Sequence, residues 1–225
     1  KVFLNWWEAE TEPEDWKNPI HKVKAPKMGI EPIQPVEINT IEQMLSKCSG
    51  NDFTVIRDRA LLLFLLDTGA RAAEVCALNL EDIDLLSGSI LIKSGKGRKP
   101  RTVYLGQKAR RSIRAYLKTR AGSGGQKETA ALWVTEKQER LTYWGMNQIL
   151  RRRALAANVK KPGLHDFRRA FALNFLRNSP GEIFSLQKLM GHSDLQVLRR
   201  YLAQTDMDIQ EAHRRGSPVD NSTLR

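Results

Sequence analysis

The chain has 225 residues, 41% of them hydrophobic, which is enough to bury one substantial domain with an appendage. Its formal net charge of +12 predicts a polyanionic partner, and nucleic acid is favoured over a membrane because no basic amphipathic helix stands apart from the core patterns. The longest apolar run, residues 60–66, is far too short to span a membrane. Cys48 and Cys76 both lie in apolar helical patterns, so we expect buried thiols and a reducing, cytoplasmic compartment.

The N-terminal part divides into an acidic helix and a basic linker. In residues 1–15, Phe3, Trp6 and Trp7 recur at helical spacing, and one Lys against four Glu and one Asp gives a net charge of −4. This pattern predicts the last helix of a domain whose remainder is missing, so we interpret the chain as a fragment of a longer intracellular protein. Residues 16–35 are interrupted by prolines and rich in lysine, which is typical of an extended linker.

From residue 36 to about residue 215 the pattern predicts a mostly α-helical domain with one small antiparallel β-sheet (α+β), followed by a flexible polar tail over 216–225. Helices are expected at 39–48 (capped by Asn39 or Thr40), at 54–67, at a short segment ending at Ala77, and at 107–120, 143–157, 166–177, 182–190, 194–203 and 206–214. The apolar second half of 54–67 predicts a central core helix. Residues 89–93 and 101–105 alternate as strands around a basic hairpin loop, and 132–134 is a candidate third strand.

The segment from Gly163 to Tyr201 holds two histidines, an arginine and a tyrosine at short intervals. His165 and Arg168 are one helical turn apart, so both can face one site, and Tyr201 follows His192 by nine residues. Arginine with histidine suggests an anionic, phosphate-like substrate, which a tyrosine could attack. Taken singly, each residue also has an ordinary explanation, as a capping or core histidine or a tyrosine packed in the core.

A second arginine box lies upstream, in the sequence Thr-Gly-Ala-Arg71-Ala-Ala-Glu74-Val. Alone, Arg71 is explained by pairing with Glu74 one turn further along a helix. Together, however, the two boxes resemble those of the tyrosine recombinases, the phage integrase family: Thr-Gly-x-Arg-x-x-Glu-Leu, then His-x-x-Arg, Leu-Gly-His-Ser and Tyr. The resemblance covers about residues 36–205. One departure is Ala70, where the family more often has a bulkier residue, and this bears on packing.

The resemblance implies a tyrosine recombinase catalytic domain, preceded by the end of a DNA-binding domain over residues 1–15. It would cleave and rejoin double-stranded DNA through a 3′-phosphotyrosyl intermediate, with no metal and no nucleotide cofactor. The implied catalytic residues are Arg71, Lys96, His165, Arg168, His192 and the nucleophile Tyr201, with Glu74 orienting Arg71. Alternatives are a type IB topoisomerase-like strand transferase, which shares this chemistry, and a DNA-binding regulator that has lost catalysis.

In the family a lysine of the hairpin protonates the leaving 5′ oxygen. Lys96 lies between two glycines at the hairpin tip, and Lys93, Arg98 and Lys99 are nearby competitors. The basic side chains expected at the DNA are Lys22, Lys24, Arg98, Lys99, Arg101, Arg151, Arg152 and Arg169. Because adjacent helical positions point about 100° apart, at most two of residues 151–153 can touch one groove. The family's C-terminal segment often docks onto a neighbouring protomer, so we expect self-association into a tetramer on DNA.

Overall fold

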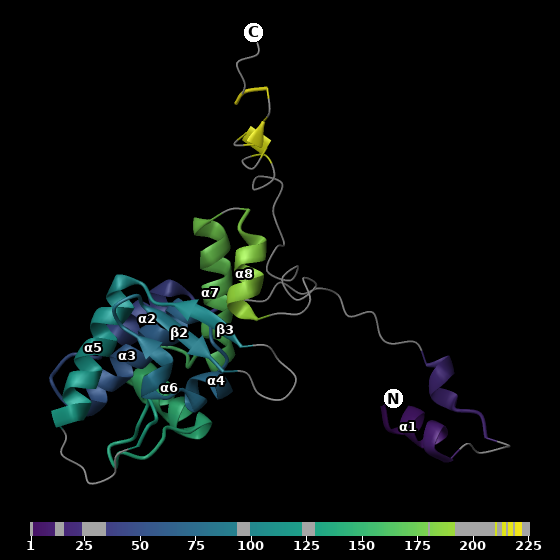
Figure 1. Ribbon diagram of the computed structural model, residues 1–225, viewed down its shortest axis with the longest axis horizontal. Coiled ribbons are helices and arrows are strands. Elements are labelled where there is room, and N and C mark those ends of the chain that lie inside the picture. The colour runs from purple at the N-terminus through teal and green to yellow at the C-terminus, as the bar shows by residue number, and fades with distance from the viewer. Residues whose placement is uncertain are drawn as a thin grey trace. The chain divides into compact units, whose positions relative to one another are not determined.

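The computed structural model of the protein describes residues 2–11, 16–23, 35–93, 100–122, 129–179 and 181–191, and residues 210, 213–214, 216–217 and 219–221. The chain divides into two compact units, Lys1–Glu31 and Pro32–Arg225 (Figure 1). The helix that the sequence predicts at 194–203, most of the one at 206–214 and the loop residues 94–99 and 123–128 lie outside the described residues.

The first unit contains helix α1 (Val2–Thr11) and the short 3-10 helix η1 (Pro19–Lys22). The sequence predicted α1, but it predicted an extended conformation for residues 16–23. Instead, the buried Asn18 side chain caps the start of η1 and donates to the carboxylate of Glu8 in α1 (2.8 Å). These bonds hold η1 against α1. The division of the N-terminal part into a domain end and a linker stays a prediction.

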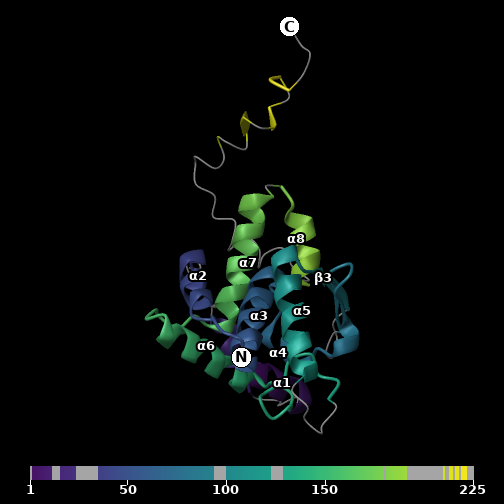
Figure 2. The same cartoon turned by 90° about the vertical axis from the view of Figure 1, so that its left-hand side faces the viewer.

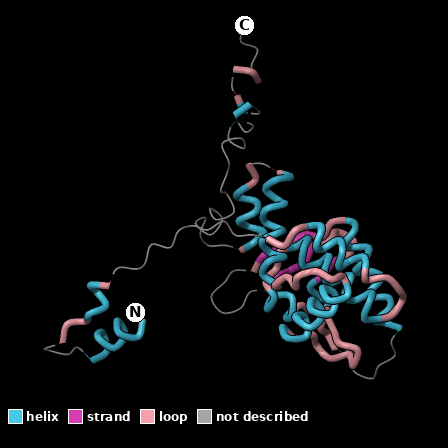
Figure 3. Tube along the Cα trace, turned by 180° about the vertical axis from the view of Figure 1, so that it is seen from behind, coloured by secondary structure: helices cyan, strands magenta, loops and turns pink. Residues whose placement is uncertain are grey.

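The second unit is mostly helical, as the sequence predicted, and its described strands form one small antiparallel sheet (Figure 3). Its elements are α2 (Ile38–Ser46), α3 (Phe53–Thr68), α4 (Ala72–Ala77), η2 (Leu80–Asp82), β1 (Ile83–Asp84), β2 (Ser89–Ile92), β3 (Arg101–Tyr104), α5 (Gln107–Gly122), α6 (Tyr143–Ala156), α7 (Leu164–Asn178) and α8 (Ile183–Met190). The predicted helices among these are confirmed to within about two residues at each end. The cap of α2 was predicted wrongly, because Glu37 occupies the N-cap position.

Helix α3 is the centre of the second unit. Ala60, Leu61, Leu62, Phe64 and Leu65 are all buried, because α2, α5 and α7 pack around the helix (Figure 2). A nearly continuous apolar run is what a helix enclosed on most sides requires. Since burying one large apolar side chain contributes about 1.5–3 kcal/mol, this helix supplies a large share of the core energy.

The sheet has the order β1-β2-β3, with all pairs antiparallel. Its register pairs Ile90 with Val103 and Ile92 with Arg101. Ile90, Ile92 and Val103 are buried, and side chains two residues apart in a strand share a face. Arg101 therefore projects from the inward face of β3, alongside Val103.

The third strand was predicted wrongly. It is formed by β1, whereas residues 132–134 form no strand of this sheet; Val134 makes only an isolated antiparallel bridge with Arg140, and Trp133 turns into the core. There the Trp133 ring stacks on Tyr116, with ring centroids 5.2 Å apart, and meets Phe64 edge-on at 5.3 Å.

A buried ion cluster, which was not predicted from the sequence, joins α3 to α6. Asp58 is fully buried, and its oxygens contact the guanidinium groups of Arg57 (2.7 Å) and Arg153 (2.8 Å). Such a cluster is costly to break, because removing one partner leaves a buried charge uncompensated. Arg153 therefore supports the fold, whereas Arg151 and Arg152 are exposed, although Arg152 also lies 3.8 Å from Asp58.

The turn after α3 depends on Gly69. Its φ is +58°, its N–H donates to the Leu65 carbonyl at 3.3 Å, and a Cβ there would lie 2.4 Å from Cδ1 of Phe171 in α7. Glycine satisfies both conditions, because it tolerates left-handed backbone and has no side chain to meet the ring. The turn can therefore lie directly against α7.

We expect Gly69→Ala to lower the free energy of unfolding by about 2–4 kcal/mol, through left-handed strain together with overpacking against Phe171. Chemical denaturation of the two proteins measures the difference. The loss should be smaller when Phe171 is already alanine, because the ring that the new methyl group meets is then absent. An equal loss in both backgrounds would show that this ring does not restrict the position.

Candidate active site

The first arginine box folds as the start of α4. Arg71 occupies the N-cap position; its N–H donates to Oε2 of Glu74 (2.7 Å) and its Nη1 donates to Oε1 (3.1 Å). A glutamate at the third position of a helix suits this arrangement, since it satisfies a free N–H and faces the positive end of the helix dipole. The pair leaves the Arg71 side chain 26% exposed, so part of its guanidinium remains accessible.

Arg168 lies in the first half of α7 and is only 2% exposed. Its Nη1 donates to the carbonyl of Gly69 and its Nη2 to the carbonyl of Met190, both at 2.7 Å. A buried guanidinium requires such acceptors, because it would otherwise lose its hydration without compensation. Arg168 thus links the turn after α3 to the end of α8.

The two arginines meet at the C-terminal end of α8. Arg71 Nη1 lies 3.5 Å from the same Met190 carbonyl oxygen that Arg168 contacts, and Arg71 Nη2 donates to the Gly191 carbonyl at 3.4 Å. The last carbonyl groups of a helix have no partners within it and carry the negative end of its dipole, so they attract cations. The structure therefore brings Arg71 and Arg168 together.

Arg101, from β3, completes this arrangement. Its Nη1 and Nη2 donate to the two oxygens of Glu74 at 2.8 Å each, and its Nε donates to the Leu189 carbonyl at 2.7 Å. The prediction that Arg101 contacts DNA is not supported by this position, because its nitrogens face acceptors of the protein and the side chain is 11% exposed. Gly191, with φ +61°, leaves room for it: a Cβ there would lie 2.9 Å from Cδ of Arg101.

Glu74 remains ionised between the two arginines. Burial by itself would raise its pKa, but hydrogen bonds from Arg101 and from the Arg71 N–H, together with both positive charges, lower the pKa to about 2. At neutral pH the carboxylate is therefore negative and offsets one of the two neighbouring charges.

His165 lies in the first turn of α7, one turn before Arg168. Its ring reaches the surface, yet partial burial and the positive charges of Arg169 and Arg168 lower its pKa below the usual 6.5. The imidazole is thus neutral at neutral pH and able to accept a proton. Arg169 pairs with Asp166 (3.2 Å), which also accepts from the N–H of Gly163 and so caps the helix.

Six predicted site residues lie outside the described residues: Lys24, Lys96, Arg98, Lys99, His192 and Tyr201. Lys93, a competitor for the role of acid, is described, and its Nζ lies 2.7 Å from Asp82 and 2.6 Å from Glu81. Hydrogen bonds to Asp82 and Glu81 raise the pKa of Lys93. A lysine held in this way releases its proton less readily, which argues against Lys93 as the acid.

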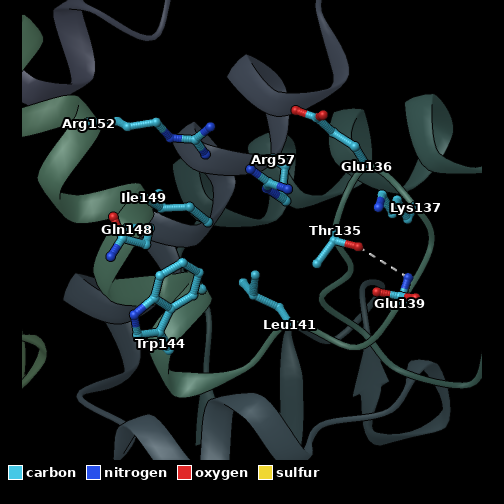
Figure 4. A pocket seen from close by; sticks show the side chains of 11 residues that line it. Arg57, Thr135, Glu136, Lys137, Glu139, Leu141, Trp144, Gln148, Ile149 and Arg152 are labelled. Atoms are coloured by element: carbon cyan, nitrogen blue, oxygen red, sulfur yellow. Dashed lines mark hydrogen bonds between the residues drawn. The ribbon is translucent and has the colours of Figure 1, made fainter.

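The exposed side of α6 borders an open groove of about 470 Å³. Trp144 and Arg152 of this helix line one side of it, and Glu136 and Lys137 of the preceding loop line the other (Figure 4). Trp144 is 71% exposed, so the groove offers an aromatic face beside a cation. The charges of Arg151 and Arg152 predicted a contact with DNA, whereas Trp144 was not predicted, although its spacing from Arg152 places both on one helix face.

Among the described residues, no group of three or more His, Cys, Asp or Glu side chains is arranged to hold a metal ion. Nor is any helix in the described part of the chain both long and apolar enough to cross a membrane. Cys48 is buried and Cys76 half-buried, and both are free thiols. The ionisable groups that gather at the described site are thus arginines, one glutamate and one histidine.

Known proteins resemble this chain in sequence. The sequence model of the phage integrase family matches residues 34–207. The tyrosine recombinase XerC of Alcanivorax borkumensis is 30% identical over 195 residues, which cover 86% of this chain and 62% of that protein. XerC of Leptospira interrogans serovar copenhageni is 32% identical over 206 residues, covering 89% of this chain and 64% of that protein. The chain therefore spans a little under two thirds of the length of these relatives.

Solved structures resemble it in fold. The XerH site-specific recombinase, in a post-cleavage complex with palindromic difH substrate, superposes with a TM-score of 0.72 at 22% identity, over 96% of this chain and 64% of that one. The family match extends from before α2 to beyond α8, and it includes both arginine boxes, Arg71 and Arg168 among them. On this evidence the chain belongs to the phage integrase family, the tyrosine recombinases.

Proposed function

We propose that this chain is the catalytic part of a site-specific recombinase that cleaves and rejoins double-stranded DNA through a 3′-phosphotyrosyl intermediate. The observation that carries the proposal is the meeting of Arg71 and Arg168 at one acceptor, the carbonyl oxygen of Met190. Arg71, whose side chain is partly exposed, would bind a non-bridging oxygen of a phosphate, and the buried Arg168 beside it would add positive charge that stabilises the charge developing there. The relatives that bear the name tyrosine recombinase support it.

In the proposed reaction the hydroxyl oxygen of Tyr201 attacks phosphorus and the bond to the 5′ oxygen breaks. The tyrosine proton passes to neutral His165, Lys96 protonates the leaving oxygen, and His192 hydrogen-bonds the phosphate. A 5′ hydroxyl of a second strand then attacks the phosphotyrosine and releases the tyrosine. Each step exchanges one phosphate ester bond for another.

This exchange conserves bond energy, so we propose no nucleotide cofactor. Arg71 and Arg168 would supply the positive charge that a divalent metal ion supplies in other phosphoryl-transfer sites, so no metal is proposed either. The compartment would be the cytoplasm, where DNA is accessible and where thiols such as Cys48 and Cys76 stay reduced.

Phosphate contacts outside the active site are proposed for Lys22, Lys24, Arg98, Lys99, Arg151, Arg152 and Arg169. Such contacts set the position of the protein on the duplex without reading its sequence. Arg151 and Arg152 are exposed on α6, and Arg153, which is bound to Asp58, is not one of them. Arg101 is likewise left out, because it is bound to Glu74 and its side chain is only 11% exposed.

We also propose that the segment after Tyr201 joins protomers into a tetramer on DNA. Its apolar residues Met207, Ile209 and Ala212 stand among acidic and polar ones. So small an apolar set is poorly suited to fix a helix on its own domain, whereas it can add to a contact already favoured by DNA.

Tyr201 should become covalently linked to DNA. The substrates are nicked duplexes that together cover the DNA flanking the gene. After cleavage of a nicked duplex, the short cleaved end diffuses away and the covalent complex cannot be reversed. The duplex that contains the recombination site should therefore give a slower-migrating protein–DNA band. Tyr201→Phe should lose the band and still bind that duplex, because only the nucleophilic oxygen is removed. Peptide mapping that places the DNA on another tyrosine, or a wild-type protein that binds but never links, would contradict the assignment.

Sulfur in place of the 5′-bridging oxygen should restore cleavage by Lys96→Ala. A thiol ionises at a pKa of about 8.5, far below an alcohol, so a thiolate leaves without a proton from an acid. The same substrate should not rescue Arg71→Ala to that degree, because charge on the non-bridging oxygens develops with either leaving group. Single-turnover cleavage rates on both substrates measure this. Selective rescue of Lys93→Ala or Lys99→Ala instead would assign the acid to that lysine.

Deleting residues 206–225 should reduce assembly on DNA that carries two sites and leave single-strand cleavage partly intact. Sedimentation of the protein–DNA complexes measures the assembly, and Met207→Ser with Ile209→Ser should reproduce the loss if the apolar contact causes it. Assembly unchanged by the deletion would rule out a role of this segment between protomers.

A further inference from the structure

We infer that Arg101 is a positioning residue that neutralises Glu74, so that Arg71 keeps its positive charge for the DNA phosphate. The inference rests on the proposed function and adds to it a residue that does not touch the substrate. Its basis is the unequal way in which the two arginines share one carboxylate.

Arg101 has the stronger hold on Glu74. It forms a two-pronged pair, with both distances 2.8 Å, whereas the guanidinium of Arg71 makes one contact of 3.1 Å to the same carboxylate. Parallel paired bonds of this kind are stronger and more directional than a single contact. The negative charge of Glu74 is therefore balanced mainly by Arg101.

Burial separates the two arginines further. The Arg101 side chain is 11% exposed and that of Arg71 is 26% exposed, so Arg101 is the enclosed partner and Arg71 the accessible one. Arg71 also directs its second nitrogen away from Glu74, toward the carbonyl of Gly191. A neutral carbonyl leaves the net charge of Arg71 unchanged, and an anionic oxygen can displace it.

Removal of Arg101 would change what Arg71 does. Glu74, mostly buried and ionised, would have Arg71 as its nearest remaining cation and would take it as the two-pronged partner. The Arg71 charge would then be cancelled and its donors turned from the phosphate. A second consequence would be the loss of the Arg101 bond to the Leu189 carbonyl, which ties β3 to the end of α8.

These two consequences predict opposite results for a double variant. If charge balance is what matters, Arg101→Met should slow single-turnover cleavage roughly 10- to 100-fold, and adding Glu74→Gln should restore about tenfold, because the unbalanced carboxylate is gone. If Arg101 only ties β3 to α8, the double variant should be as slow as Arg101→Met or slower. The site-bearing nicked duplex that traps the wild-type protein is the substrate.

Two more variants separate charge from hydrogen bonding. Arg101→Gln keeps an uncharged donor for the Leu189 carbonyl and should cleave nearly as slowly as Arg101→Met. If Arg101→Met does not fold, Arg101→Gln replaces it in the experiment. Arg101→Lys keeps the charge with poorer geometry and should fall between these variants and the wild type. The charge-balance role is overturned if Gln is as active as Lys.

Arg120→Met is the matched control. Arg120 is partly buried and donates to the carbonyls of Thr129, Ala131 and Leu132, so it loses as many partners but no carboxylate is involved. Its cleavage rate should stay within about twofold of the wild type at temperatures where it is folded. A loss equal to that of Arg101→Met would point to general destabilisation and overturn the inference.

A second readout does not depend on the proposed reaction. Inorganic phosphate should raise the melting temperature of the wild-type protein, and the part of this rise that disappears in Arg71→Met reports on binding at Arg71. This Arg71-dependent rise in melting temperature should be lost in Arg101→Met and regained in the double variant Arg101→Met with Glu74→Gln. If no duplex is cleaved, the proposed function fails while this titration still decides the inference: no loss in Arg101→Met would overturn it.

Discussion

The described site depends on the carbonyl end of α8. Its last carbonyl groups, at residues 189–191, have no partners within the helix, and among the described residues they accept from Arg71, Arg101 and Arg168. A helix end of this kind is negative, and the planar guanidinium can hold several acceptors at fixed angles. A few directional bonds therefore fix the relative positions of α4, β3 and α7, and with them the positions of the three arginines.

The helix that carries these carbonyls is held by a small apolar cluster of its own. Ala172 of α7 packs with Leu186 and Met190 of α8, and this cluster is separate from the main core around α3. Figure 1 shows α7 and α8 lying side by side. Met190 thus has two roles: its side chain is buried in the small cluster while its carbonyl oxygen faces the arginines. Because so few buried side chains hold α8, its position relative to α3 is more easily disturbed than the core itself.

Much of the fold could be predicted from local pattern. Strands β2 and β3 show alternating apolar residues, and α3 lies in an apolar pattern too long for a strand, so all three were predicted and are confirmed. The third strand could not be predicted, because β1 has two residues and residues 132–134 have a strand-like composition. In the structure Trp133 of this segment stacks on the Tyr116 ring of α5. Local periodicity contains no information about such a partner.

The sequence by itself determined which side chains are suited to phosphate chemistry, because Arg71, His165 and Arg168 lie in short motifs whose internal spacing is set by one helical turn. Only the tertiary structure decided how the charges pair. In the sequence Arg101 looked like one more basic residue of the hairpin. Its alternation with Val103 indicated that its side chain points inward. Its carboxylate partner, however, lies 27 residues away. The partner of Arg153 lies 95 residues away. A buried charge is set by whichever opposite charge folding brings within reach, and separations of this length leave no trace in a local pattern.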